Sequence, residues 1–378
     1  MINSTLKKIF LFTIFSRKKI FKPKLNKLLI FDQVGSNILK KSLPNYNPAV
    51  LSIRGEELNL FIIFSVLLSQ TYLIIRPRLF WKAYIDLYIK EVNPKIILTY
   101  IDNNHFFYSL KNKFPNIKFF SIQNGYRFSK GDLFGEFDNL KYLKNKKNYF
   151  KCDYIFCFNK QVAKLYKKNI DCKTVTIGSF KNNLIENKNR KKNNVFLLIS
   201  SFGLGNLDAE KKLLPIIQNF CNNNKINFSI LGRTSQSGEE IFYNSFKKKY
   251  PINFQKNLGK SNFKHSYNTV DKARVVLSLN ATLGYESLSR KNKTIFLNFK
   301  DRDLNCNSYL SFGWPLKMSK NGKFWISTFN KKKINKIFND IYKMSYKNWI
   351  KNCYPISKKI ISYDNGNKTF LKKVNNVF

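Results

Sequence analysis

Acidic residues and histidines are scarce in this sequence of 378 residues. It contains 22 Asp and Glu against 68 Lys and Arg, which gives a formal net charge of +46, and its two histidines are His105 and His265. Its six cysteines form no CxxC pair. Zinc sites and disulfide frameworks require clusters of Cys and His that are missing here. We therefore expect no metal centre, and reduced cysteines packed as small hydrophobic side chains in a cytoplasmic protein.

The sequence also lacks a long apolar stretch. The run from Ile9 to Phe15 is at the lower limit for a signal peptide, and basic residues follow it where a cleavage site needs small ones. The segment 60–75 contains two Ser, a Gln and a Thr, and is shorter than the about 20 residues of a membrane span. We interpret it as a buried helix that continues into a strand. The chain is expected to be soluble, or peripheral at the inner face of the cell membrane, with the basic segment 7–24 in contact with anionic lipid.

Arginine is rare among the basic residues, since 58 of the 68 are Lys and 10 are Arg. Together with abundant Asn, Ile and Phe, this composition is typical of codon bias on solvated surfaces. The positive field can still attract nucleotide diphosphates, anionic lipids or nucleic acid. A nucleic-acid-binding protein is therefore one alternative. Against it, the lysines are spread over all segments and no RNP motif, KH loop or zinc finger is present, so we expect no nucleic-acid partner.

Short apolar runs alternate with segments of helical period over most of the chain. This alternation is typical of parallel sheets with crossover helices. The expected strands are 27–32, 49–53, 95–100, 117–122, 154–158, 174–177, 195–200, 227–231, 252–254, 275–279 and 294–298. The expected helices are 81–92, 208–222, 239–248, 263–273 and 284–290. The pattern predicts an α/β protein with two Rossmann-like, doubly wound domains.

The segment 182–194 is dense in Asn, Lys and Glu and has the composition of a linker. We therefore predict one domain over residues 1–185 and a second domain over residues 191–330. The last segment, 331–378, is basic and partly helical, and a helix that crosses back to the first domain would suit it. Two such domains enclose a cleft in which ligands bind at the carboxyl ends of the strands.

Two features of the second half suit a phosphate-bearing donor. A strand ends before Thr282, which is a good N-cap, and the helix that follows can hold a pyrophosphate at its start while Glu286 accepts hydrogen bonds from ribose hydroxyls. Arg233 follows another strand, where its guanidinium can bind phosphate through two hydrogen bonds. The alternatives are an ordinary helix start for Thr282 and Glu286, and a surface ion pair for Arg233.

A DxD triplet, Asp301 and Asp303, follows the strand expected at 294–298. Two carboxylates so spaced can share a divalent cation, but Arg302 lies between them and a polar loop is the simpler interpretation. We expect donor binding without a metal or other cofactor.

Polar residues follow two neighbouring strands of the first half. Asp102 and His105 come after one strand, and Gln123 and Asn124 come after the next. Either Asp102 or His105 can act as the general base for a sugar hydroxyl, and His105 can instead bind a phosphate. The alternative is that these are turn and cap residues. Because both strand ends face the expected cleft, we predict that the four side chains converge there.

Four segments resemble the signature blocks of bacterial surface-carbohydrate biosynthesis proteins. The segments are IDNNHFFYSL, SIQNGYR, DYIFCFNKQVAKLY with TIGSFKNN, and NATLGYESLSRKNK with IFLN. That group is similar to GT-B transferases such as polysialyltransferases and glycerophosphotransferases, and the resemblance covers residues 27–315.

The resemblance implies a GT-B glycosyltransferase with a nucleotide-sugar donor and a surface-polysaccharide or lipid-linked glycan acceptor. It implies donor diphosphate contacts at Thr282 and Gly284 and a nucleotide contact at Glu286. Gln123, Asn124 and Gly125 would line the cleft from the acceptor side. A glycerophosphotransferase-type polymer synthase remains the alternative, because it would share the fold and a nucleotide-linked donor.

Overall fold

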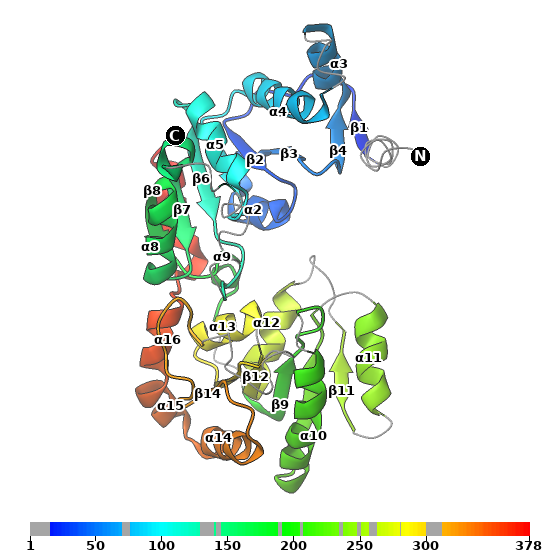
Figure 1. Cartoon of the computed structure of the whole chain (residues 1–378), viewed down its shortest axis with the longest axis vertical. Helices are drawn as coiled ribbons and strands as arrows, with labels where there is room; N and C mark the ends of the chain where they lie inside the picture. The colour runs from blue at the N-terminus through cyan, green and yellow to red at the C-terminus, as the bar shows by residue number, and fades with distance from the viewer. Residues whose placement is uncertain are drawn as a thin grey trace.

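Two parallel sheets dominate the structure, a computed structural model. It describes residues 16–69, 76–128, 140, 145–187, 191–204, 207–233, 237–247, 251–256, 263–279, 281–299 and 312–378. Within these residues each sheet has six strands, and the sheets form the upper and lower halves of the molecule in Figure 1. The predicted α/β fold with two doubly wound domains is confirmed, and every predicted strand that falls on described residues is present.

The first sheet is covered by helices on both faces. Its strand order is β3 (Ala49–Leu51), β2 (Leu28–Phe31), β5 (Ile96–Thr99), β6 (Lys118–Ile122), β7 (Lys151–Cys157) and β8 (Asp171–Thr176). One face packs against α3 (Leu60–Ser69), α4 (Pro77–Val92), α5 (His105–Lys113) and α8 (Lys160–Asn169). The other packs against α2 (Ser36–Ser42), α9 (Phe180–Asn183) and α17 (Lys368–Asn375). Burial on both faces explains why these strands have nearly continuous apolar sequences.

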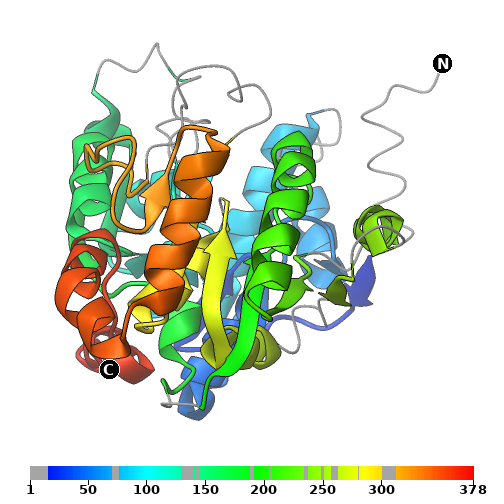
Figure 2. The ribbon, with the colours of Figure 1, turned by 90° about the horizontal axis from the view of Figure 1, so that it is seen from below.

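The second sheet has the strand order β11 (Asn253–Gln255), β10 (Asn227–Leu231), β9 (Asn193–Ile199), β12 (Ala273–Ser278), β13 (Thr294–Leu297) and β14 (Trp325–Ile326). Its larger core lies under α10 (Leu207–Asn223), α11 (Ser237–Lys247), α13 (Thr282–Ser289), α14 (Lys331–Lys343), α15 (Tyr346–Asn352) and α16 (Tyr354–Ile360). Helices α10 and α14 lie side by side on this face (Figure 2). The opposite face packs against α12 (Phe263–Lys272).

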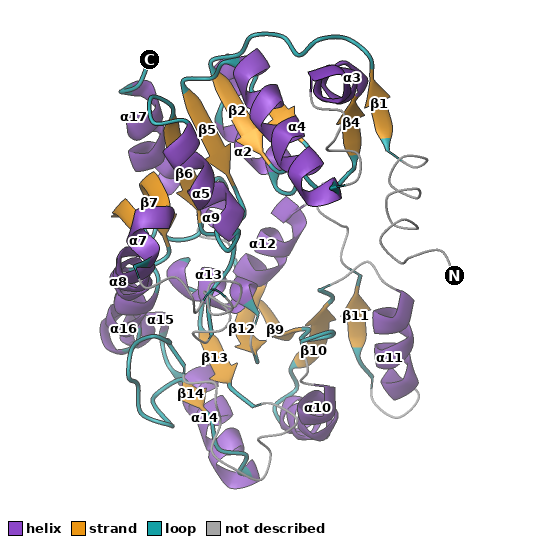
Figure 3. Ribbon diagram, turned by 45° about the horizontal axis from the view of Figure 1, so that its top comes forward, coloured by secondary structure: helices purple, strands orange, loops and turns teal. Residues whose placement is uncertain are grey.

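The C-terminal helix α17 returns from the second domain to the first (Figure 3). Phe370 and Val374 are fully buried in the same core as Phe120 and Phe156 of the first sheet. The rings of Phe370 and Phe156 lie 5.0 Å apart in an edge-to-face arrangement. The last helix is therefore a structural part of the first domain.

Two local predictions are wrong: the buried character of the helix within 60–75, and the start of the linker at residue 182. Helix α3 lies within the segment expected to be a buried helix, but Ile62 and Val66 are its buried residues, while Phe64 and Leu68 are exposed. It packs beside a two-stranded sheet, β1 (Arg17–Lys19) and β4 (Glu57–Asn59), that was not predicted. The strand expected after it falls on residues 70–75, which lie outside the described part. Among the helices that are described, none has the length and apolar character needed to cross a membrane.

The segment expected to be a linker begins inside a packed region. Asn182 and Asn183 are buried, because the side chain of Asn182 donates to Ser289 Oγ (2.9 Å) and that of Asn183 donates to Asn367 Oδ1 (2.8 Å). Composition alone therefore placed the start of the linker too early. One further helix, α7 (Lys146–Tyr149), precedes β7.

Candidate functional site

The loop after β6 and the start of α13 touch each other across the two domains. The backbone N–H of Tyr126 donates to Thr282 Oγ1 (3.1 Å), and the Tyr126 ring stacks on Tyr285 with centroids 3.5 Å apart and planes 4° apart. A Cβ on Gly125 would lie 3.4 Å from Thr282 Oγ1. The structure thus brings the predicted acceptor-side loop and the predicted donor-side helix into direct contact.

Asp102 is fully buried and accepts hydrogen bonds on both carboxylate oxygens. Oδ1 receives the Arg127 guanidinium and the backbone N–H of Asn124 (3.1 Å), and Oδ2 receives the Tyr166 hydroxyl. Burial and the neighbouring carboxylate raise the pKa of Tyr166 well above its ordinary value, so this hydroxyl keeps its proton. We call Asp102, Asn124, Arg127 and Tyr166 the Asp102 cluster. It fixes the conformation of the loop after β6.

Gln123 supports the same loop from inside the domain. Its side chain accepts from the backbone N–H of Phe158 (2.9 Å) and donates to the carbonyl of Gly125 (2.8 Å), and 1% of it is exposed. The side-chain oxygen of Asn124 accepts from Arg127 (3.2 Å). Of the three predicted acceptor-side residues, Gln123 therefore shapes the loop, and Asn124 and Gly125 are partly accessible at its surface.

His105 is half-buried and begins helix α5, one residue after the N-cap Asn104, whose side chain accepts from the backbone N–H of Phe106 (3.0 Å). Its ring meets the Phe150 ring edge-on, with centroids 6.3 Å apart. His105 thus follows β5 as predicted, and is more accessible than Asp102.

Glu286 forms a second contact between the domains. Its carboxylate accepts the hydrogen bond of Ser179 Oγ, and the residue is 2% exposed. One turn further, Arg290 forms a buried ion pair with Asp271 and also donates to Asn182 Oδ1 (3.2 Å). Neither Ser179 nor Arg290 was predicted from the sequence. The rarity of Arg, which drew attention to Arg233, applies equally to Arg290.

The start of α13 differs in detail from the prediction. Ala281 is the N-cap and makes no side-chain cap, so Thr282 is the first helical residue and its assignment as N-cap is wrong. Gly284 packs against β12, where a Cβ would lie 2.3 Å from Ser278 Oγ, and its own N–H donates to the carbonyl of Ala281 (3.0 Å). Gly284 is therefore required for close packing of helix on strand.

Arg233 lies exposed after β10, as predicted, and is held by the loop after β9. Its Nη1 donates to the carbonyl of Phe202 (2.8 Å), and its backbone N–H donates to Glu239 Oε1 (2.8 Å). Glu239 also accepts from Ser200 Oγ. The carboxylate therefore joins the ends of two neighbouring strands.

Glu210 is a second buried acid at this place. Both of its oxygens lie 2.9 Å from the Tyr243 hydroxyl, and Oε1 accepts from the backbone N–H of Ser201 (3.2 Å). Burial raises the pKa of Glu210 to about 7. We call Ser200, Glu210, Glu239 and Tyr243 the Glu210 cluster. It was missed from the sequence, although the scarcity of acids could have drawn attention to two Glu that follow strand ends.

Asp301 and Asp303, the predicted candidates for a metal pair, lie outside the described residues. In the described part, no three His, Cys, Asp or Glu side chains come together as metal ligands.

Comparison with known families matches residues 120–206 and 205–377 to a family model described as "putative O-antigen biosynthesis protein". The chain belongs to this family. The matched region contains the loop after β6, Ser179, the Glu210 cluster and all of α13, so the contact between the domains lies within it. The resemblance to surface-carbohydrate biosynthesis proteins is confirmed. A sequence search among curated proteins finds no match.

Solved structures share the fold. The UDP-GlcNAc 2-epimerase of Methanocaldococcus jannaschii, in complex with UDP-GlcNAc and UDP, has a TM-score of 0.54 at 13% identity, over 92% of this chain and 99% of that one. The wall teichoic acid polymerase TagF has a TM-score of 0.51 at 11% identity, over 93% and 88%. The pneumococcal O-GlcNAc transferase GtfA has a TM-score of 0.47 at 12% identity, and the match covers 78% of this chain and 60% of GtfA. At these identities the likeness to the epimerase and to TagF, whose TM-scores exceed 0.5, establishes the fold alone.

Proposed function

We propose that the chain is a glycosyltransferase that moves a sugar from a nucleotide-activated donor to a surface-polysaccharide or lipid-linked glycan acceptor. The observation that carries the proposal is the contact between the loop after β6 and the start of α13. Ligands of doubly wound sheets bind at the carboxyl ends of strands, and these two strand ends come from different domains. Membership of an O-antigen biosynthesis family supports the same function.

The donor diphosphate is assigned to the second domain, at Arg233 and the first turn of α13. The exposed Arg233 offers a planar, permanently charged group for phosphate. Thr282 Oγ1 accepts the Tyr126 N–H, so its own proton can be donated to a phosphate oxygen. Gly284 contributes by letting α13 approach β12 closely.

Glu286 is assigned to the ribose of the donor nucleotide. In this structure its carboxylate accepts the hydroxyl of Ser179, and a ribose hydroxyl is a donor of the same kind. Nucleotide binding would therefore exchange one hydroxyl for another. This exchange makes Ser179 a competitor of the nucleotide.

The competition gives a direct test by calorimetry with UDP, CDP and GDP. Glu286→Ala should weaken binding of the preferred nucleotide by about 1–3 kcal/mol, because it removes a buried acceptor. Ser179→Ala should strengthen binding. Ser289→Ala is the matched control, since it removes another buried contact between the domains without touching the Glu286 carboxylate. Wild-type affinity of Glu286→Ala for all three nucleotides would reject the assignment.

Proton transfer from the acceptor hydroxyl is assigned to His105. Of the two predicted bases, Asp102 has both oxygens engaged and an Arg partner, which suits a positioning role. His105→Gln should lower kcat strongly with little change in KM for the donor. An unchanged kcat would remove His105 from the mechanism.

The donor is proposed to bind without a metal or other cofactor. Turnover in excess chelator should then proceed almost unchanged. Loss of activity that manganese restores would instead assign Asp301 and Asp303 as ligands.

The turnover assay can also distinguish this function from the alternative ones. Reaction with CDP-glycerol in place of a nucleotide sugar would indicate a glycerophosphotransferase. A donor sugar that changes configuration without any acceptor would indicate an epimerase.

Peripheral contact with an anionic membrane, at its cytoplasmic face, completes the proposal. Exposed large apolar side chains gather on residues 17–79, namely Ile20, Phe21, Leu25, Phe61, Phe64, Leu68 and Leu79. Phe21 is 86% exposed and Leu68 is 85% exposed. Basic residues such as Lys18 and Lys24 lie beside them and line a pocket of ≈ 620 Å³. Lysines that attract headgroups and apolar side chains that enter the interface are the usual means of such contact.

Sedimentation with phosphatidylglycerol vesicles at low salt tests the contact. The double variant Phe21→Ser, Phe64→Ser should bind less than the wild type, whereas Ile241→Ser, at an exposed site on α11, should bind equally well. Wild-type protein that stays in the supernatant would exclude the membrane contact. Residues 7–15 of the basic segment 7–24, which is predicted to touch lipid, lie outside the described part.

A further inference from the structure

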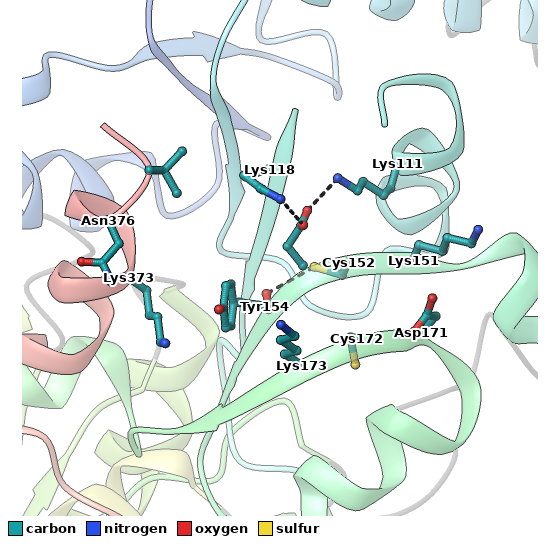
Figure 4. Close-up of a pocket in the computed structure, with 12 residues that line it drawn as sticks. Lys111, Lys118, Lys151, Cys152, Tyr154, Asp171, Cys172, Lys173, Lys373 and Asn376 are labelled. Carbon is teal, nitrogen blue, oxygen red and sulfur yellow. Dashed lines mark hydrogen bonds and ion pairs between the residues drawn. The ribbon is translucent and has the colours of Figure 1, made fainter. Parts of the chain in front are cut away.

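A lysine-lined pocket lies in the first domain at the edge where the strands begin. Lys118, Lys151 and Asp171 are the first residues of β6, β7 and β8, and all three line the pocket. Its volume is ≈ 460 Å³, and its far wall is formed by Lys373, Asn376 and Val377 at the end of α17 (Figure 4). The loop after β6 and the Asp102 cluster lie at the opposite ends of these strands. The pocket is therefore separate from the contact between the domains.

The pocket carries an excess of positive charge. Five lysines line it, Lys111, Lys118, Lys151, Lys173 and Lys373, against the two acids Asp153 and Asp171. The Asp153 carboxylate is shared by Lys111 (2.9 Å) and Lys118 (3.2 Å). Burial opposes its ionisation, but hydrogen bonds from Lys111 and the Phe119 N–H hold the pKa of Asp153 below its ordinary value. Asp153 therefore has its counter-ions already.

The other lysines have no acidic partner. In the described part of the chain, Lys151, Lys173 and Lys373 form no ion pair. They come from three different segments, and Figure 4 shows Lys373 reaching from α17 toward Tyr154. Its Nζ lies 5.1 Å from the centroid of that ring. Asp171, the cross-strand neighbour of Lys151, is the other acid of the pocket, so these three lysines outnumber it and would repel one another less if an anion bound there.

The remaining wall adds little negative charge. Burial raises the pKa of the Cys172 thiol to about 12 and that of Cys152 well above its ordinary value, so both thiols are neutral near pH 7. The Tyr154 ring is held by an edge-to-face contact with Phe120 at 5.3 Å. The pocket thus combines an aromatic wall, held by its contact with Phe120, with the positive charge of the lysines.

We propose that this pocket binds a phosphate ester of a small sugar or polyol. A phosphomonoester carries about 1.5 to 2 negative charges at pH 7 and several strong acceptor oxygens, which suit the three lysines without acidic partners. The volume exceeds that needed by a phosphate ion and falls in the range of small-molecule sites, which leaves room for a polyol or sugar against Tyr154. The phosphate group can come from a soluble ester or from a lipid headgroup.

Calorimetry with sn-glycerol 3-phosphate tests the soluble source, and sedimentation with vesicles that contain phosphatidic acid tests the lipid source. The pocket variant is Lys151→Gln, Lys173→Gln, Lys373→Gln. The control variant is Lys331→Gln, Lys332→Gln, Lys336→Gln, which removes the same charge from exposed positions of α14. The single variant Lys173→Glu, at an exposed position, repeats the test with minimal risk to folding. All calorimetry is done with saturating UDP, so that the proposed donor site is occupied.

The pocket variant should bind one of the two probes at least tenfold more weakly than wild type, while the control stays within twofold. A loss seen with glycerol 3-phosphate identifies a soluble ester as the ligand, and a loss seen with vesicles alone identifies a lipid phosphate. Equal binding by pocket variant, control and wild type for both probes would overturn the proposal and make these lysines ordinary surface charge.

Discussion

The two domains each bury a carboxylate cluster at the carboxyl ends of their strands, but they compensate its charge differently. In the Asp102 cluster the carboxylate contacts an arginine. In the Glu210 cluster the donors to Glu210 are neutral, a tyrosine hydroxyl and a backbone N–H. Both clusters hold a loop that the proposed mechanism uses. The comparison teaches that an ion pair fixes the first loop, whereas the second loop depends on an acid whose pKa burial raises to about 7.

The largest effect is expected from breaking the ion pair of the first cluster. Asp102→Asn leaves the Arg127 guanidinium buried without its counter-charge, which should lower the free energy of unfolding by about 3–5 kcal/mol. Urea unfolding of the variant and of the wild type measures this loss of free energy. Asp86→Asn removes an acid from a solvent-exposed pair with Lys113 and should cost less than about 1 kcal/mol. Similar losses in both variants would mean that burial of the pair is unimportant.

The next largest effect is the pH dependence that the Glu210 cluster gives to the free energy of unfolding. The pKa of Glu210 is about 7 in the folded protein, against an ordinary value of 4.5. The protonated form therefore favours folding, and this stabilisation is complete below about pH 4.5 and lost as the pH rises through 7. The difference between these two pKa values corresponds to about 3 kcal/mol in the free energy of unfolding.

Urea unfolding between pH 4.5 and 8 tests this dependence. Glu210→Gln should remove the part of the pH dependence that comes from this group, because the amide does not titrate. Glu240→Gln, on the exposed side of the neighbouring helix α11, should keep it. An unchanged slope in Glu210→Gln would show that Glu210 stays ionised in the folded state.

A smaller effect separates the two tyrosines. Tyr166→Phe removes a hydrogen bond to a carboxylate that is paired with an arginine and should cost about 1.5–3 kcal/mol, whereas Tyr243→Phe at pH 5 removes one to a protonated acid and should cost about 1 kcal/mol. Thermal unfolding at that pH ranks the two. If Tyr243→Phe is the more damaging variant, the contrast between the clusters is wrong.

Most strands and several helices could be predicted from local pattern, because a strand buried on both faces is a short apolar run between turns. Helix α3 shows where this fails. Its sequence is apolar on all sides, so composition could not reveal that Phe64 and Leu68 face solvent. Strand β1 has the sequence RKK, which has no strand pattern at all.

The sequence allowed the candidate site to be predicted as a set of residues at strand ends. It did not allow prediction of the residues that form hydrogen bonds with them. The sequence placed Asp102 after a strand, yet the groups that engage its carboxylate lie 25 and 64 residues further along the chain. The bond from Ser179 to Glu286 joins residues 107 apart. Such contacts depend on how the two sheets are placed, and a local pattern contains no information on that. The roles assigned to Arg233, Thr282 and Glu286 remain predictions.

The return of α17 sets the order in which the domains can be completed during synthesis. Phe370 and Val374 belong to the core of the first domain, but the ribosome makes them after the whole second sheet. At 5–20 residues per second, the roughly 190 residues from α9 to Val374 take roughly 10 to 40 seconds. During that time the face of the first sheet around Phe120 and Phe156 lacks part of its cover. The domain that is made first is thus finished last.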